Sequence, residues 1–282
     1  MPLFDLHIHS TCSDGSLTPQ ELIALAVKSR VQTISLTDHD TVEGLAEAYT
    51  QAEKHNINLI SGIELSASSH SRSIHILGYG LDFKDPNLLK ELNDIQLARK
   101  IRNKKIIEKL KKSGINIEEE NLRQYSPSGQ TGRPHFAHIL LDRHVVKSHQ
   151  EAFDMYLGVN GLAYSPRQIL EAEKAISIIR KAHGVAVLAH PFTISVPITT
   201  LETMIKELVD FGLSGIEIYY PQHSLQFRTQ LKKICRKFNL LETAGSDFHD
   251  IKRSGTRLGA FHNSQNVPAE IVVKLKEYLT EL

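Results

Sequence analysis

The feature that most limits the possible folds is a regular alternation between short β-rich runs and amphipathic helical stretches. Seven runs are typical of strands, because they are short, apolar and rich in branched side chains. They cover residues 3–8, 33–36, 59–65, 73–80, 185–189, 215–219 and 241–245. This alternation predicts an α/β fold with a parallel sheet.

Two helix starts carry recognisable capping residues. Thr18-Pro19-Gln20-Glu21 supplies an N-cap, a proline at the first helical position and a capping-box glutamate. Asp40-Thr41-Val42-Glu43 repeats this pattern after the second strand, which predicts that Asp40 is an N-cap. Further helices are expected over residues 201–211, 224–238 and 269–282.

The alternation is interrupted between residues 86 and 179, where helical periodicity dominates. We therefore predict a helical subdomain at 86–179, inserted into a domain that consists of 1–85 and 180–282. Its first helix, expected over 86–113, contains the run "RKIRNKKIIEKLKK" at 99–112. This run fits a solvated basic helix face, and alternatively a surface that attracts phosphate or RNA.

Composition limits the partners and the compartment. The formal charge is only +1, so nothing in the whole chain indicates a nucleic-acid coat or a membrane surface. Two cysteines, Cys12 and Cys235, do not make a disulfide framework. We find no uncharged apolar stretch of about 18 residues. We expect a soluble cytoplasmic protein with no membrane association and no stable protein partner.

Nine side chains of the kinds that bind metals fall at or near the ends of the predicted strands. In a parallel α/β barrel the carboxyl ends of the strands form one rim, where active sites lie. Two pairs with i, i+2 spacing, His7 with His9 and Asp247 with His249, each place two donors on one face. The full set is His7, His9, Asp14, His39, Glu64, His75, His190, Asp247 and His249. Their convergence predicts a metal centre.

Nine ligands exceed the needs of one ion, since a catalytic zinc usually takes three protein ligands and leaves a position for water. Two or three divalent ions are therefore expected. The three carboxylates contribute a charge of −3, so one ion leaves the cluster at −1 and three ions bring it to +3, which suits a phosphate. Imidazole and carboxylate donors are compatible with manganese, zinc or iron. We expect manganese as the working metal.

Six motifs, in this order along the chain, resemble those of the PHP family, named for polymerase and histidinol phosphatase. They are "DLHIHSTCSDG", "TDHDT", "GIELSA", "IHILGYG", "LAHP" and "GSDFH". Three more, "TGRPHFA", "AYSPR" and "IEIYYPQHS", resemble the subgroup with 3′,5′-nucleoside bisphosphate phosphatases and short 5′-to-3′ exoribonucleases. The resemblance implies a distorted (β/α)7 TIM-like barrel with an inserted helical subdomain that closes over three metals.

The resemblance also implies a role for each ligand. The first metal would be held by His7, His9, Glu64 and Asp247, the second by Glu64, His75 and His190, and the third by Asp14, His39 and His249. Phosphate contacts are implied for Arg133 and His135, and for His223 by a weaker match. Asp250 stands where the family motif has glycine, which affects only the expected shape of the last loop.

The expected activity is metal-assisted hydrolysis of a phosphate ester. Metal coordination lowers the pKa of water to about 7, so a metal-bound hydroxide can attack without a separate general base. Asp38 and Asp40, on either side of His39, are candidates to orient the ligands. The resemblance implies the 3′-phosphate of a 3′,5′-nucleoside bisphosphate as the expected substrate. The alternatives are a 5′-to-3′ exoribonuclease acting on short 5′-phosphorylated RNA, a histidinol-phosphate phosphatase, and a metal-binding PHP module without catalysis.

Overall fold

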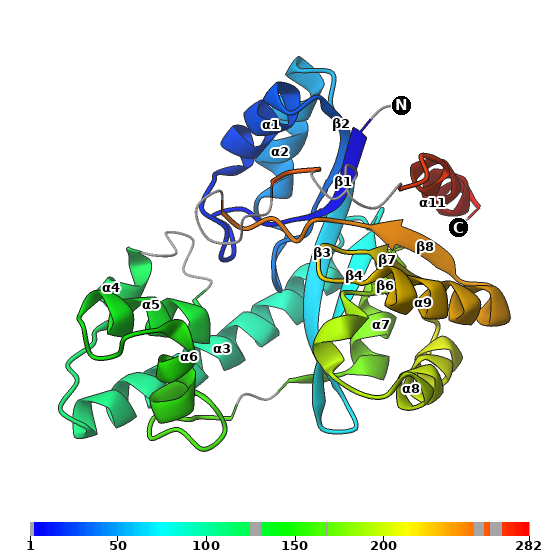
Figure 1. The fold of residues 1–282 in the computed structure, drawn as a ribbon. Helices are drawn as coiled ribbons and strands as arrows, with labels where there is room; N and C mark the ends of the chain where they lie inside the picture. Colours follow the sequence, from blue (N-terminus) through cyan, green and yellow to red (C-terminus); the bar gives the residue numbers. More distant parts are fainter. Residues whose placement is uncertain (1–2, 125–130, 167–168, 251–256, 260–266, 282) are drawn as a thin grey trace.

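One mostly parallel sheet forms the centre of the molecule (Figure 1). The computed structural model describes residues 3–124, 131–166, 169–250, 257–259 and 267–281. The strand order is β1-β2-β3-β4-β6-β7-β8, and the two-residue β5 pairs with β3. The strands are β1 (Leu3–Ile8), β2 (Val31–Leu36), β3 (Asn58–Ser69), β4 (Arg72–Tyr79), β5 (Leu170–Glu171), β6 (Val185–Leu188), β7 (Gly215–Tyr219) and β8 (Leu241–Ala244). All seven predicted strands are confirmed, and β5 is the one that the sequence did not indicate.

The expectation of a parallel sheet is wrong at β4, which runs antiparallel to both of its neighbours, β3 and β6. The reason is the length of the connection. Only His70 and Ser71 join β3 to β4, and both have a left-handed backbone, with φ of 49° and 62°. A parallel pair needs a crossover of a dozen or more residues, whereas two residues suffice for a hairpin.

The helices next to the sheet follow the predicted alternation. They are α1 (Pro19–Lys28), α2 (Leu45–Lys54), α7 (Ala172–Lys181), α8 (Ile198–Asp210), α9 (Leu225–Phe238) and α11 (Glu270–Thr280). Figure 1 shows α1 and α2 side by side next to β1 and β2, with α7, α8 and α9 next to the other half of the sheet. The end predicted for the last helix, Leu282, lies outside the described residues.

The two predicted caps have different outcomes. Thr18 and Glu21 form the expected capping box at the start of α1. Asp40 is not an N-cap, because α2 begins five residues later, at Leu45, and its N-cap is Gly44. Asp40 has a left-handed φ of 54°, and its carboxylate accepts hydrogen bonds from the backbone N–H and the hydroxyl of Ser66. The N-cap pattern was misleading because the carboxylate of Asp40 accepts hydrogen bonds from Ser66 in β3 and does not cap the start of α2.

The described residues form two hydrophobic cores. The larger contains the inner residues of the sheet and of α1, α2, α7, α8, α9 and α11. The smaller lies between residues 106 and 163, around Phe136 and Leu140. The 27-residue helix α3 (Pro86–Lys112) joins them, since Leu92 belongs to the first core and Leu110 to the second. The second part also contains α4 (Glu119–Arg123), α5 (Arg133–Asp142) and α6 (His149–Ala152), which Figure 1 shows gathered at the far end of α3, and a short π-helix (Phe153–Leu157).

Among the described residues, none of the helices has the length and apolar character needed to cross a membrane.

Candidate metal centre

The loop after β1 is fixed at the carboxyl edge of the sheet by one buried carboxylate. Asp38 accepts hydrogen bonds from the backbone N–H and hydroxyl of Ser10, at 2.7 and 2.6 Å, and from the hydroxyl of Ser13, at 2.6 Å. Gly15 closes the turn, because a Cβ there would lie 2.3 Å from the carbonyl oxygen of His9. Asp38 thus orients the loop that carries Asp14. The sequence predicts that Asp38 orients a metal ligand directly, whereas its hydrogen bonds come from Ser10 and Ser13.

The first group of donors joins the beginning of the chain to its end. His7, His9, Glu64 and Asp247 offer donor atoms that all lie within 4.8 Å of one another. The Nε2 atom of His9 lies 3.3 Å from Glu64 Oε2 and 3.1 Å from Asp247 Oδ1. The Nε2 atom of His7 lies 3.4 Å from each of the same two oxygens. These four residues are the ones expected for the first metal.

Glu64 lies at the centre of the second group. Its Oε1 atom is 2.8 Å from His75 Nδ1 and 2.9 Å from His190 Nε2, while its Oε2 atom is 2.9 Å from His39 Nδ1. His39, Glu64 and His75 form a second group within the 4.8 Å limit. His190, expected at this position, contacts the same carboxylate, and its ring centroid lies 5.2 Å from that of His75. The carboxylate is therefore shared between two groups, as expected for a bridging ligand.

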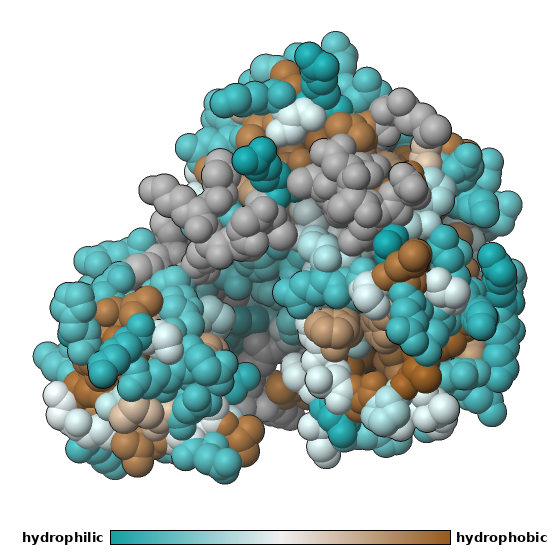
Figure 2. Space-filling view, viewed as in Figure 1, coloured by the Kyte–Doolittle hydropathy of each residue, from teal (hydrophilic) through white to brown (hydrophobic). Residues whose placement is uncertain are grey.

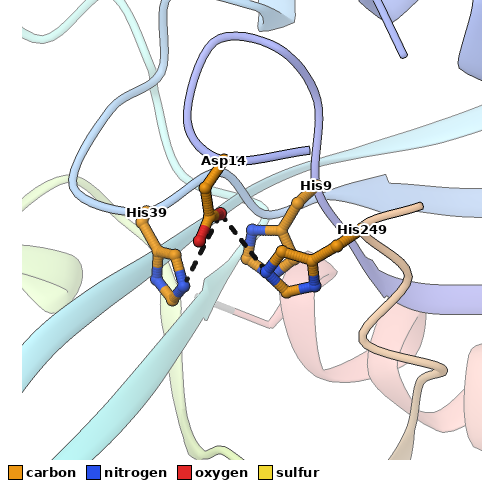
Figure 3. Close-up of side chains that lie close together, drawn as sticks. All are labelled: His9, Asp14, His39 and His249. Carbon is orange, nitrogen blue, oxygen red and sulfur yellow. Dashed lines mark ion pairs between the residues drawn. The ribbon is translucent and has the colours of Figure 1, made fainter. Parts of the chain in front are cut away.

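The third group surrounds Asp14 (Figure 3). Its Oδ1 atom lies 3.2 Å from His249 Nε2 and 3.9 Å from His39 Nε2. His9 also belongs to this group, with its ring stacked on that of His249 at a centroid distance of 4.1 Å. All nine predicted ligands therefore meet in one cluster, and His9 and His39 each belong to two groups.

Buried atoms without hydrogen-bond partners indicate that these residues fit cations. Within the described part of the chain, His7 Nε2, His9 Nε2, Glu64 Oε2, Asp247 Oδ1 and Asp14 Oδ1 are buried and make no hydrogen bond. An unpartnered buried polar atom is costly, and most native ones find a partner. Here the unpartnered atoms are imidazole nitrogens and carboxylate oxygens that face one another. Both carry lone pairs, and manganese, zinc and iron prefer such donors.

The pKa shifts within the cluster likewise favour a bound cation. Burial raises the pKa of the Glu64 carboxyl, but the imidazoles of His39, His75 and His7 outweigh it and hold that pKa well below its usual range. Burial lowers the pKa of His249, but the carboxylates of Asp14 and Asp247 raise it to about 10. The carboxylates are thus ionised, and an incoming cation competes with protons on the imidazoles.

Two of the candidate ligands have a strained backbone. His190 and Asp247 have positive φ angles of 24° and 54°. For residues other than glycine, such conformations cost about 1–3 kcal/mol and are held only by the surrounding structure. Each follows the end of a strand, β6 or β8, so the strain turns the side chain toward the cluster.

Three neighbouring residues of the cluster were missed by the sequence analysis. Glu217, in β7, lies with Oε1 2.9 Å from His7 Nδ1 and accepts the backbone N–H of His190 with Oε2 at 2.8 Å. Tyr220 donates its hydroxyl to Asp247 Oδ2 at 3.3 Å, and Thr193 contacts His190 Nδ1 at 3.0 Å. The signal for Glu217 was present, because an acidic residue interrupts the buried strand "GIEIY".

A cleft of about 230 Å³ opens from the cluster toward the second part of the molecule. Asp14, His39 and His75 line one wall, and Arg99, Arg102 and Arg133 are among the residues that line the rest. Figure 2 shows this face hollowed between the α4–α6 part and the rest, with hydrophilic residues in the hollow.

The three expected phosphate contacts are placed differently. Arg133, the first residue of α5, is half-buried and lines the cleft. His135 also lines it, and its Nδ1 accepts the backbone N–H of Gly132 at 2.9 Å. His223 does not line this cleft. It is buried between the rings of Tyr220 and Phe227, with Nδ1 2.9 Å from the carbonyl oxygen of Ile218.

The start of the basic run also reaches the cleft. Arg99 forms an ion pair with Asp40, and Arg102 is only 6% exposed. The solvated-face interpretation of this run is therefore wrong for Arg99 and Arg102, whereas Lys104 and Lys111 are exposed and pair with Glu119 and Glu118. The sequence could not distinguish the arginines that reach the cleft from the exposed lysines, because a run of charged residues does not show which helix face contacts another part of the protein.

The PHP domain family is matched over residues 5–161. The chain is 34% identical to the 5′-3′ exoribonuclease Rnm of Escherichia coli over 249 residues, which cover 88% of this chain and 85% of that protein. It is 34% identical to the 3′,5′-nucleoside bisphosphate phosphatase of Chromobacterium violaceum over 260 residues, 92% of this chain and 91% of that one.

A solved structure agrees with these matches. A protein from Bifidobacterium adolescentis, described as a metal-dependent phosphoesterase, has a TM-score of 0.85 at 26% identity and covers 96% of this chain and 94% of its own. The domain match spans more than half of the chain, and the two relatives span most of it. The chain therefore belongs to the PHP domain family.

Proposed function

We propose that this chain is a metal-dependent phosphoesterase that removes phosphate from nucleotides, with the 3′-phosphate of 3′,5′-nucleoside bisphosphates as the preferred target. One observation carries the proposal. Three members of the cluster of nine imidazole and carboxylate side chains, Asp14, His39 and His75, line the same cleft as three arginines. Metals on one side and guanidinium groups on the other suit a substrate with two phosphate groups.

For the fold, we propose the distorted (β/α)7 barrel with residues 86–179 as an insertion that covers the metals. A bridge between Ile8 and Phe248 supports closure, because it links the end of β1 to the segment after β8. The second hydrophobic core supports a separate helical unit. The proposed boundary after residue 179 cuts α7, and this helix packs with β3, β4 and β6. Its buried residues therefore belong to the larger core and not to the second core.

The metals would be held in the three sets that the family resemblance implies. Glu64 would bridge the first and second sets, and Asp14 would anchor the third. When bound, divalent ions would supply a water nucleophile of lowered pKa and neutralise charge on the phosphoryl oxygens. We propose two or three ions, with manganese as the working metal.

The chain's own residues would bind and orient the nucleotide. Arg133 can hold a phosphate through two parallel charge-assisted hydrogen bonds, a geometry that lysine does not reproduce. His135 lies two residues further along α5 and lines the same cleft. His223 would act only through Tyr220, which its ring contacts at a centroid distance of 5.1 Å.

A second candidate function, 5′-to-3′ cleavage of short 5′-phosphorylated RNA, is favoured by the likeness to Rnm and by the basic residues of α3. If α3 binds the RNA chain, the salt dependence of kcat/KM should steepen as the RNA lengthens, because more phosphates are neutralised. A histidinol-phosphate phosphatase would not need the arginines of the insertion. A non-catalytic module would not need the complete set of nine residues.

A panel of substrates separates these functions. Phosphate release by the metal-reconstituted protein should be compared for 3′,5′-nucleoside bisphosphates, 3′ and 5′ monophosphates, histidinol phosphate and 5′-phosphorylated short RNA. The proposal expects the highest kcat/KM with the bisphosphate. A highest value with RNA would favour the second candidate, and no release from any compound would favour the non-catalytic module.

A further inference from the structure

Glu217 is a fully buried carboxylate that contacts two candidate ligands from different strands. It lies in β7, where its neighbours Ile216 and Ile218 are also buried. Oε1 is 2.9 Å from His7 Nδ1, and Oε2 is 2.8 Å from the backbone nitrogen of His190. A buried charged group is retained only where it is paired and hydrogen-bonded, and both oxygens of Glu217 meet this condition.

The contact with His7 determines which ring nitrogen is free. A carboxylate can only accept hydrogen bonds, so the Nδ1 atom facing Glu217 must carry the proton. The lone pair of the neutral ring then lies on Nε2, the buried, unpartnered atom that faces Glu64 and Asp247. A histidine that donates its other N–H to a carboxylate is fixed in both tautomer and orientation.

The contact with His190 holds a strained backbone. His190 has a φ of 24°, and its N–H donates to Glu217 Oε2. This hydrogen bond stabilises the turn that directs the imidazole of His190 to Glu64. Gly245 packs on the other side, since a Cβ there would lie 2.8 Å from Glu217 Oε1 and 2.1 Å from the Cβ of His7.

We propose that Glu217 is the positioning residue of the metal centre, which selects the Nδ1–H tautomer of His7 and at the same time fixes the turn at His190. Through one side chain it prepares a ligand of the first metal and a ligand of the second. The inference rests on the proposed metal-dependent function, and it goes beyond it by linking the two sites through a residue that binds neither ion.

The test is Glu217→Gln, which keeps the shape of the side chain and removes one acceptor. If the amide oxygen keeps the bond from the His190 N–H, the amide NH₂ faces His7 Nδ1. His7 must then carry its proton on Nε2, where it blocks metal binding. Zinc bound per chain should be measured by equilibrium dialysis and elemental analysis. Expected is a fall in affinity of about 10- to 100-fold for at least one ion, with binding restored by excess zinc.

Glu242→Gln is the matched control, because Glu242 lies on the neighbouring strand β8, is partly exposed and pairs only loosely with Lys232, at 3.8 Å. It should bind zinc as the unaltered protein does. Nitrogen-15 NMR of the zinc-loaded unaltered protein supplies a measurement that needs no folded variant, and it should find the His7 proton on Nδ1.

The outcomes separate the inference from the proposed function. A proton on Nε2 of His7, or equal zinc affinity in Glu217→Gln and the unaltered protein, would overturn the role of Glu217 and leave the metal centre intact. If the unaltered protein binds no zinc, manganese or iron, the proposed function itself fails.

Discussion

At the residue scale, the candidate metal centre depends on acidic side chains that each contact several imidazoles. Asp247 is the clearest case, because its Oδ1 lies 3.1 Å from His9 Nε2, 3.4 Å from His7 Nε2 and 3.4 Å from His249 Nδ1. Tyr220 holds the other oxygen. Asp247 thus joins residues of the first and third groups.

Asp247→Asn should reduce both metal content and phosphate release. The amide has one acceptor oxygen and no charge, so it cannot replace a carboxylate that faces three imidazoles. We expect kcat to fall by more than about 100-fold, since even residues that only support metal ligands typically cost 10- to 100-fold. Elemental analysis and a phosphate assay measure the two effects. Near-normal values for both would show that Asp247 is not a ligand.

Gly245→Ala tests the close packing of the residue directly after β8 against β1. The new Cβ would lie 2.1 Å from His7 Cβ and 2.8 Å from the His7 backbone nitrogen, so the backbone must move. We expect a loss of about 3 kcal/mol or more in the free energy of unfolding, because overpacking a rigid site is costly.

Gly114→Ala provides the comparison for Gly245→Ala. Gly114 has a φ of 81° with no atom within 4 Å of an added Cβ, so only backbone strain of about 1 kcal/mol is expected. Urea denaturation of both variants checks the difference. Equal losses would mean that Gly245 does not press on His7 as described.

At the element scale, the cleft is made by bringing α3 and α5 against the carboxyl edge of the sheet. The ion pair between Arg99 of α3 and Asp40 after β2 crosses this boundary, and so does the hydrogen bond from Gln96 to the carbonyl oxygen of Asp40 at 3.2 Å. The second core keeps α5 in place, so that Arg133 at its start faces the cleft.

Arg133→Ala should raise KM for a nucleoside bisphosphate. Loss of a charge-assisted contact costs about 1.5–3 kcal/mol, which corresponds to roughly 10- to 100-fold. Arg133→Lys should restore only part of the loss, because lysine cannot make the bidentate contact. Arg143→Ala, an exposed position after the other end of α5, is the control. Steady-state kinetics with an unchanged KM for Arg133→Ala would exclude Arg133 as a phosphate contact.

Much of the fold follows from local patterns, and the exceptions have physical causes. The strands and the start of α1 were predictable because apolar runs and capping residues act locally. The direction of β4 depends on the two-residue turn at His70, and β5 is too short to have a pattern of its own. Asp40 was misplaced because its partner, Ser66, lies on another strand.

At the scale of the whole molecule, residues far apart in the sequence make one site. His7 and Asp247 are 240 positions apart and share the first group, and the bridge from Ile8 to Phe248 brings their segments together. The convergence of the nine candidate ligands was predictable because they lie within or shortly after strands whose ends share an edge. Tyr220 and the arginines of α3 were not, because side-chain contacts between elements have no sequence period, and the one signal for Glu217 was an acidic residue within a buried strand.

Divalent-metal binding by this cluster and phosphate release that depends on it can be measured in one experiment. The direct measurement is a titration of chelator-stripped protein with manganese, in which bound ions per chain and phosphate release from a 3′,5′-nucleoside bisphosphate are recorded together. The account predicts release at background level without metal, a rise as two to three ions bind, and no comparable rise for Asp247→Asn. Full phosphate release by the metal-free protein, or the same titration curve for Asp247→Asn, would contradict it.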